Sequence, residues 1–301
     1  MTIEFGSGAI VTLGDRRVLQ TGRWRWARAL AWMVGLVFLI ALSFGPGMEA
    51  IQHLLPKGDP RFGFVSNVSG AAIALAAYAL FVRLGEDRVP DEVAPQPAPL
   101  HLLAGLTLGT IMFTTVMAIM ATFGLYHITW HGPAPAWHAA GIAIQSGFFE
   151  EIIVRGVILR LLWRAFGPLA AFVVSAALFG IAHLFNPGAT IVAALCVALE
   201  AGVTLGAFYA LTGRLWMSIG VHVAWNFTQG YLFGAPVSGG KLGPALAQSI
   251  ARPGAATWQT GGAFGPEASL PALVICSSIG LAVLWYAWKA GRFEAAPMPV
   301  R

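Results

Sequence analysis

"FFEEIIVRG", residues 148–156, places two adjacent acids and an arginine inside an otherwise apolar run. The chain has 301 residues, of which 57% are hydrophobic and only 10% are charged. Its mean hydropathy of +0.72 is too high for a soluble domain of this length. We therefore expect an all-α, polytopic membrane protein, in which buried charges need a specific reason.

Eight apolar runs are long enough, at about 20 residues each, to cross a bilayer. They predict an eight-transmembrane-helix bundle with spans near residues 29–44, 62–81, 100–125, 138–163, 168–185, 189–211, 215–233 and 269–288.

The distribution of basic residues predicts the orientation of this bundle. With a cytoplasmic N-terminus, thirteen of the 18 Lys and Arg residues fall on the cytoplasmic side. Only Lys57, Arg61, Lys241 and Arg252 fall outside, and Arg155 lies within a span. This asymmetry predicts a multi-pass protein of the cell (inner or plasma) membrane with both termini in the cytoplasm. The net charge of +5 then reflects loop bias, and no nucleic-acid partner is expected.

The chain divides at the proline-rich stretch "DEVAPQPAP", residues 91–99. Residues 1–99 would form a cytoplasmic tail, two spans and a linker, and residues 100–301 a six-helix core. The Gly/Pro/Ala-rich residues 234–267 would form an external loop, either a flap or a disordered connector. Cys196 and Cys276 fall in spans and are expected to be apolar fillers.

Ionisable side chains are costly in hydrocarbon and normally face a cavity or a partner. A helical rise of about 1.5 Å per residue puts Glu150, His183 and Glu200 about 21–22 Å from the cytoplasmic face. Asn226 comes out at about 18 Å and His222, the weakest fit, at about 12 Å. Polar groups from four predicted helices thus gather at broadly one depth.

Their chemistry suits hydrolysis of an amide bond, which needs a base, a holder for water and donors for the oxyanion. Glu150 is the candidate base and His183 would help to hold the water. His222 and Asn226, four residues apart on one helix face, would donate to the oxyanion. Glu151 and Arg155 have the same spacing and would pair in a supporting role. Phe179 shares a face with His183.

Simpler interpretations remain open for single residues. Glu151 and Arg155 could form only a structural ion pair, and each histidine could be a satisfied core residue. Glu200 could line the pocket or could pair with Arg155. Glu150, His183 and His222 could also bind zinc with an open position, although a His-Glu-x-x-His signature is missing. No cofactor is certain, and a divalent metal is the alternative to metal-free glutamate catalysis.

The same residues resemble the motifs of the CPBP family, the CAAX prenyl endopeptidases and bacteriocin-processing proteins. "EEIIVRG" is similar to its Glu-Glu-x-x-x-Arg motif, "FGIAH" (residues 179–183) to Phe-x-x-x-His, and "HVAWN" (residues 222–226) to His-x-x-x-Asn. The resemblance covers about residues 139–231. It implies an eight-helix intramembrane endopeptidase, often named a metalloprotease. The equivalents of Glu150 and His183 would activate water, and those of His222 and Asn226 would stabilise the oxyanion. Val154 stands where many members have Phe, a packing position.

We therefore expect an intramembrane endopeptidase that acts on a membrane-embedded or lipid-modified protein or peptide. Two alternatives belong to other classes: a non-catalytic, peptide-binding immunity or scaffold protein, and a proton-coupled transporter. The transporter is disfavoured because the sequence shows no paired repeats.

Overall fold

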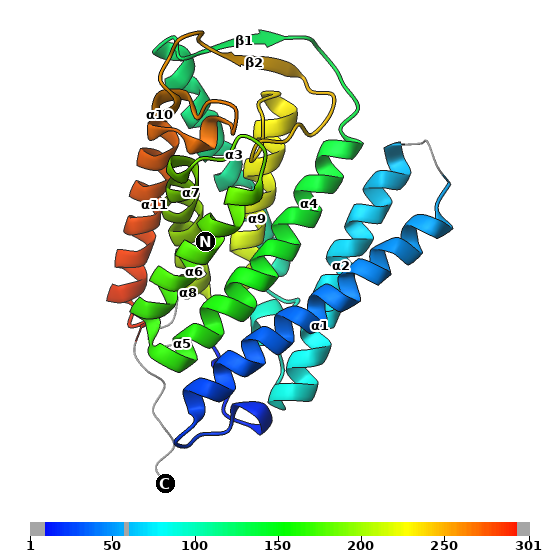
Figure 1. The fold of residues 1–301 in the computed structure, drawn as a ribbon, viewed down its shortest axis with the longest axis vertical. Helices are drawn as coiled ribbons and strands as arrows, with labels where there is room; N and C mark the ends of the chain where they lie inside the picture. The colour runs from blue at the N-terminus through cyan, green and yellow to red at the C-terminus, as the bar shows by residue number, and fades with distance from the viewer. Residues whose placement is uncertain (1–9, 57–59, 294–301) are drawn as a thin grey trace.

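The computed structural model describes residues 10–56 and 60–293 as a bundle of long helices, shown in Figure 1. Lys57 and Arg301, which entered the charge count, lie outside the described residues. The first helices are α1 (Arg25–Leu54), α2 (Pro60–Glu86), α3 (Ala98–Thr122) and α4 (Trp137–Glu151). A π-helical segment, η3 (Ile152–Leu159), joins α4 to α5 (Arg160–Phe166).

The second half of the chain adds more interrupted helices. After α6 (Pro168–Ala182) and the 3-10 turn η4 (His183–Phe185), α7 (Ile191–Val197) leads through the π-helical η5 (Ala198–Val203) into α8 (Thr204–Thr212). Next, α9 (Leu215–Phe227) ends in the π-helical η6 (Thr228–Leu232), and α11 (Leu270–Lys289) is the last long helix. Many side chains of these helices that are large and apolar are exposed on the outside of the bundle, as expected for a surface that faces lipid.

Six helical stretches in the described residues are long and apolar enough to cross a membrane. They correspond to six predicted spans, in α1, α2, α3, α6–η4, α7–η5–α8 and α11. The predicted spans 138–163 and 215–233 fall on the helical stretches α4–η3–α5 and α9–η6, which do not meet that criterion. The first carries five charged residues between 150 and 164, and this lowers its hydropathy. The count of eight spans therefore stays a prediction.

One end of the bundle carries a small sheet that the all-α expectation omitted. Strand β1 (Tyr126–Trp130) pairs antiparallel with β2 (Ala247–Ala251), with Tyr126 opposite Ala251 and Trp130 opposite Ala247. The sheet lies across the top of Figure 1, and the short helix α10 (Thr257–Thr260) lies below it at the upper left. Residues 234–267 are therefore a folded cover, and the alternative of a disordered connector is wrong.

Helices α3 and α9 pack through glycines at almost backbone contact. A Cβ on Gly105 would lie 2.5 Å from the carbonyl oxygen of Met217, and one on Gly109 would lie 2.4 Å from that of Val221. A Cβ on Gly220, on the facing side, would lie 2.8 Å from the oxygen of Leu102. Small residues let membrane helices approach this closely. This packing fixes the position of α9 in the bundle.

The opposite end of the bundle is held by buried ion pairs. Arg160 donates to both carboxylate oxygens of Glu86, at 2.6 and 2.8 Å, and has no exposed surface. Arg88 bonds to Glu86 and, in a bidentate pair, to Glu92. Burial alone would raise the pKa of Glu92, but the bonds from Arg88 and the charge of Arg160 outweigh it and lower that pKa. Arg88 and Arg160, taken as loop charges in the sequence, are thus bound in a network that ties α2 to α5.

Candidate functional site

The acidic pair at the end of α4 forms one half of the site. Glu151 is fully buried, and its Oε1 accepts hydrogen bonds from Arg155 Nη1 at 2.7 Å and from His222 Nδ1 at 2.9 Å. Glu150 points elsewhere, as expected for adjacent helical residues. Its side chain is 33% exposed, but its Oε2 is buried without a hydrogen-bond partner, 3.8 Å from His222 Nε2. His222 therefore lies between the two carboxyl groups.

Arg155 connects three elements from within the π-helical segment η3. Besides Glu151, its guanidinium donates to the carbonyl oxygens of Ala201 and Gly202 in η5, at 2.7 and 3.2 Å. It also lies over the Phe179 ring of α6, 4.8 Å from the centroid. The side chain is 1% exposed. A buried charge held by a carboxylate, two carbonyls and an aromatic face fixes the relative positions of η3, η5 and α6.

Phe179 also connects the two histidines of the site. Its ring lies 4.6 Å from that of His183 and 6.4 Å from that of His222, edge-on in both cases. His183, at the start of η4, has Nδ1 2.8 Å from the carbonyl oxygen of Phe179. Because a carbonyl only accepts, Nδ1 carries the proton in this contact, and Nε2 of a neutral His183 ring is an acceptor.

Asn226 lies one turn beyond His222 on α9, and its Nδ2 donates to Ser146 Oγ on α4 at 3.1 Å. Helices α4 and α9 are therefore joined at two levels, by Glu151–His222 and by Ser146–Asn226.

A cavity of about 50 Å³ adjoins these side chains. A volume of this size holds only a few water molecules. Four of the predicted residues line it with polar groups: His183, Glu200, His222 and Asn226. Ser238 and Glu267 from the cover line it as well. Glu150 is not part of this wall and adjoins it through His222.

Glu200 and Glu267 are the two carboxyl groups of this cavity. Glu200, in η5, is 3% exposed and its Oε2 has no partner, so it lines the pocket. The alternative pairing with Arg155 is not formed, since Arg155 binds the carbonyls that follow Glu200. Glu267, just before α11, accepts from the backbone N–H and the hydroxyl of Ser238. Burial raises the pKa of Glu267 to about 8, and the bonds from Ser238 only partly offset this.

The structure brings His222 into the site although its estimated depth fitted least. That estimate assumed that the turn before α9 lies level with the other turns. The turn is instead enclosed: Gly213 packs against the carbonyl of Ile10, and Arg214 and Trp216 donate to the carbonyls of Asp91 and Ala94. The turn is thus packed against other segments, and a residue count from Arg214 did not anticipate the contacts of His222 with Glu150 and Glu151.

The three candidate zinc ligands do not lie in one ready-made group. Within residues 10–56 and 60–293, no group of three or more His, Cys, Asp or Glu side chains is arranged to hold a metal ion. Glu150, His183 and His222 therefore do not present zinc with a ready set of three ligands, although each lies near the site. Cys196 and Cys276 are buried free thiols, as expected for fillers.

The sequence interpretation missed Ser146, Ser238 and Glu267. Glu267 was detectable in principle, because it is the only acid in an otherwise Gly/Pro/Ala-rich loop and directly precedes an apolar run. Ser146 lies one helical turn before Glu150, on the helix that carries the acidic motif. Ser238 had no signal, since only folding of the cover brings it to the site.

Residues 132–228 match the family model described as type II CAAX prenyl endopeptidase Rce1-like. The match covers less than half of the chain and supports a relationship to the CPBP family. No curated protein and no solved structure matches the chain. The matched segment spans α4 to the start of η6 and contains all three motifs, from Glu150 to Asn226. It indicates a CAAX-type membrane protease and favours neither of the other two classes of function.

Proposed function

We propose that the chain is an intramembrane endopeptidase whose site is assembled by His222. The observation that supports this most directly is the continuous contact from Glu150 through His222 and Glu151 to Arg155. It joins the first and third motifs, while Phe179 and His183 of the second motif pack against it. A structural ion pair alone would need only Glu151 and Arg155.

Glu150 is proposed as the general base. Its Oε2 is an acceptor without a partner, so it is available to take a proton from water. His183 Nε2, with Nδ1–H directed to a carbonyl, would hold that water from the α6 side. Neither role requires a bound metal, and the candidate ligands are not grouped for one.

His222 and Asn226 are proposed as donors to the oxyanion. Glu151 accepts from Nδ1 of His222, which leaves Nε2 on the side of Glu150, at 3.8 Å from its Oε2. A proton on Nε2 makes the ring an imidazolium, which donates a charge-assisted hydrogen bond to the developing oxyanion. Ser146 holds the Asn226 amide in place.

The proposed substrate is a membrane-associated or lipid-modified protein or peptide, bound in the bilayer. The cavity is too small for a peptide segment, so binding must displace part of its wall. Ser238 and Glu267 form the wall that comes from the cover. Cleavage therefore includes a step in which the cover moves away from His183 and His222.

The test is cleavage of candidate membrane peptides by the purified protein in lipid nanodiscs. Loss of a general base lowers the rate by about 10²–10⁴-fold, so Glu150→Gln is expected to fall by this amount while it stays folded. Glu49→Gln, which removes an exposed acid of α1, is the matched control and keeps full activity. Cleavage by Glu150→Gln at the wild-type rate would refute the assignment.

A second arm repeats the assay with a chelator. Activity that depends on Glu150 and resists the chelator supports metal-free catalysis. A peptide that binds without being cut would indicate the scaffold function, and uptake that requires a pH gradient would indicate the transporter.

A further inference from the structure

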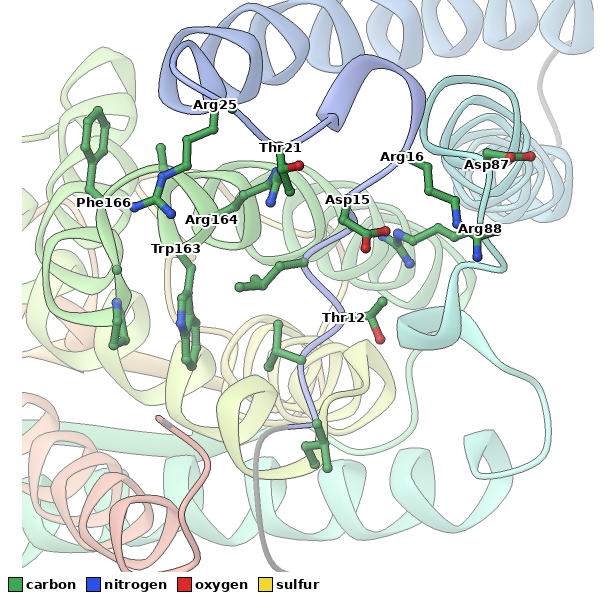
Figure 2. A pocket seen from close by; sticks show the side chains of 18 of the residues that line it. Thr12, Asp15, Arg16, Thr21, Arg25, Asp87, Arg88, Trp163, Arg164 and Phe166 are labelled. Atoms are coloured by element: carbon green, nitrogen blue, oxygen red, sulfur yellow. The ribbon is translucent and has the colours of Figure 1, made fainter. Parts of the chain in front are cut away.

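A second and much larger cavity lies far along the bundle from the site, where α1 begins, α2 ends and α5 turns into α6. Its volume is about 1640 Å³. Figure 2 shows the chain through Thr12 and Asp15 crossing it, with Arg25, Arg164, Trp163 and Phe166 on one side and Arg16 and Arg88 on the other. None of the three motifs contributes to it.

The lining of this cavity is basic. Six arginines and two aspartates line it: Arg16, Arg23, Arg25, Arg83, Arg88, Arg164, Asp15 and Asp87. Arg88 is neutralised by Glu86 and Glu92, and Asp87 pairs with Arg17 at 3.5 Å. Among the described residues that line the cavity, basic side chains therefore outnumber acidic ones.

One arginine of this cavity has an unsatisfied donor. Arg164 and Arg25 occupy the same side of the cavity in Figure 2. Arg164 donates to the carbonyl of Leu19, but its Nε is buried without a hydrogen-bond partner. Burial lowers the pKa of Arg164, and the charge of Asp15 opposes this only in part. An anion beside Arg164 would accept the remaining N–H, as phosphate does from arginine.

The remaining surface of the cavity is apolar. Val11 and Trp163 are buried in the wall, and Phe166 and Phe293 continue it. A cavity with basic and apolar walls fits an amphiphile better than a free phosphate ion, which has no apolar part to bury.

The position of the cavity along the bundle indicates which kind of amphiphile can reach the cavity. Trp24 and Trp26, at the start of α1, are 57% and 44% exposed beside the cavity. Exposed tryptophans at helix ends are typical of the membrane–water interface, and this end has the basic excess expected of the cytoplasmic face. Basic pockets between helices on that face bind anionic lipid headgroups.

We propose that this cavity binds the phosphate headgroup of an anionic phospholipid, with Arg164 at the phosphate and the aromatic wall against the glycerol and upper acyl chains. The bound lipid holds residues 10–22 against α5 and α2. The site is independent of the proposed protease activity.

The test measures lipid binding to the full chain in detergent by native mass spectrometry. Phosphatidylglycerol and phosphatidylcholine with identical acyl chains are compared, and we expect one phosphatidylglycerol to bind more tightly. Each basic side chain near a membrane surface is worth roughly a fivefold change in affinity for anionic lipid. Arg23→Gln/Arg83→Gln should therefore lose about thirtyfold, and no side-chain hydrogen bond that holds the fold is removed.

The control is Lys241→Gln/Arg252→Gln, which removes two exposed charges from the cover end of the bundle and should leave the affinity unchanged. Arg164→Lys keeps the positive charge but loses the planar guanidinium donors. It should therefore lower the affinity for phosphatidylglycerol less than Arg164→Gln does. Equal binding of the two lipids, or equal loss in both double variants, would overturn the proposal. Displacement of the lipid by glycerol 3-phosphate at equal concentration would show a site for a free phosphate and would also overturn it.

Discussion

Gly109→Ala tests whether the contact between α3 and α9 positions the site. The added Cβ would lie 2.4 Å from the carbonyl oxygen of Val221, where ordinary contacts are 3.4–4 Å. The two backbones must therefore separate by about 1 Å, at a cost of about 1–3 kcal/mol for overpacking. Val221 directly precedes His222, so the same shift changes the position of the imidazole relative to Glu151.

A displacement of about 1 Å in a catalytic group costs about 10²-fold in rate. We expect Gly109→Ala to lower the midpoint of thermal unfolding in detergent and to slow peptide cleavage by about that factor. Unfolding tests the packing argument whether or not the chain is a protease.

Gly63→Ala in α2 is the matched control, because a Cβ there meets nothing within 4 Å. Gly63 lies in the first turn of α2, where alanine is still the better helix former, so this variant should be at least as stable as the wild type. If Gly109→Ala unfolds and cleaves like Gly63→Ala, the close approach of α3 and α9 does not position His222.

Two further predictions concern buried charges outside the three motifs. Arg160→Gln leaves Glu86 buried without its bidentate partner, and should destabilise the protein by about 3–5 kcal/mol in thermal unfolding, whereas Arg83→Gln, on the exposed surface of α2, should be near neutral. Glu267 has a pKa of about 8 in the folded protein against an ordinary value of 4.5, so the unfolded chain loses this proton first and stability should decrease as pH rises from 4.5 to 8. Glu267→Gln should remove that decrease, which amounts to a few kcal/mol, and a variant with an unchanged pH profile would contradict the burial argument.

Much of the site was predictable because its polar residues occur in short sequence motifs with helical spacing. Glu151 and Arg155 pair as their spacing predicts. Charged side chains of apolar helices must face the interior of the bundle and not the lipid, so the charged motifs of different helices come together there. The helices could be predicted for the same reason, since a bilayer allows few other structures.

The remaining features depend on contacts between distant segments. The pairing of β1 with β2 joins residues more than a hundred positions apart, and Glu267 reaches the site only because this cover folds. The turn before α9 is enclosed by contacts with Ile10, Asp91 and Ala94, which lie far from it in the sequence. Neither arrangement leaves a periodic signal in the sequence.

The three π-helical segments have a consequence for how this chain can vary. Arg155 lies in η3 and Glu200 in η5, while η6 directly follows α9. A π turn accommodates one extra residue in an α-helix, so deleting a single residue from η5 would restore regular α-helical hydrogen bonds in that turn. Arg155 would then lose the two carbonyls that it binds in η5, although every motif residue would still be present. Related chains that preserve the three motifs but carry a one-residue gap in this turn would therefore need a different anchor for that arginine.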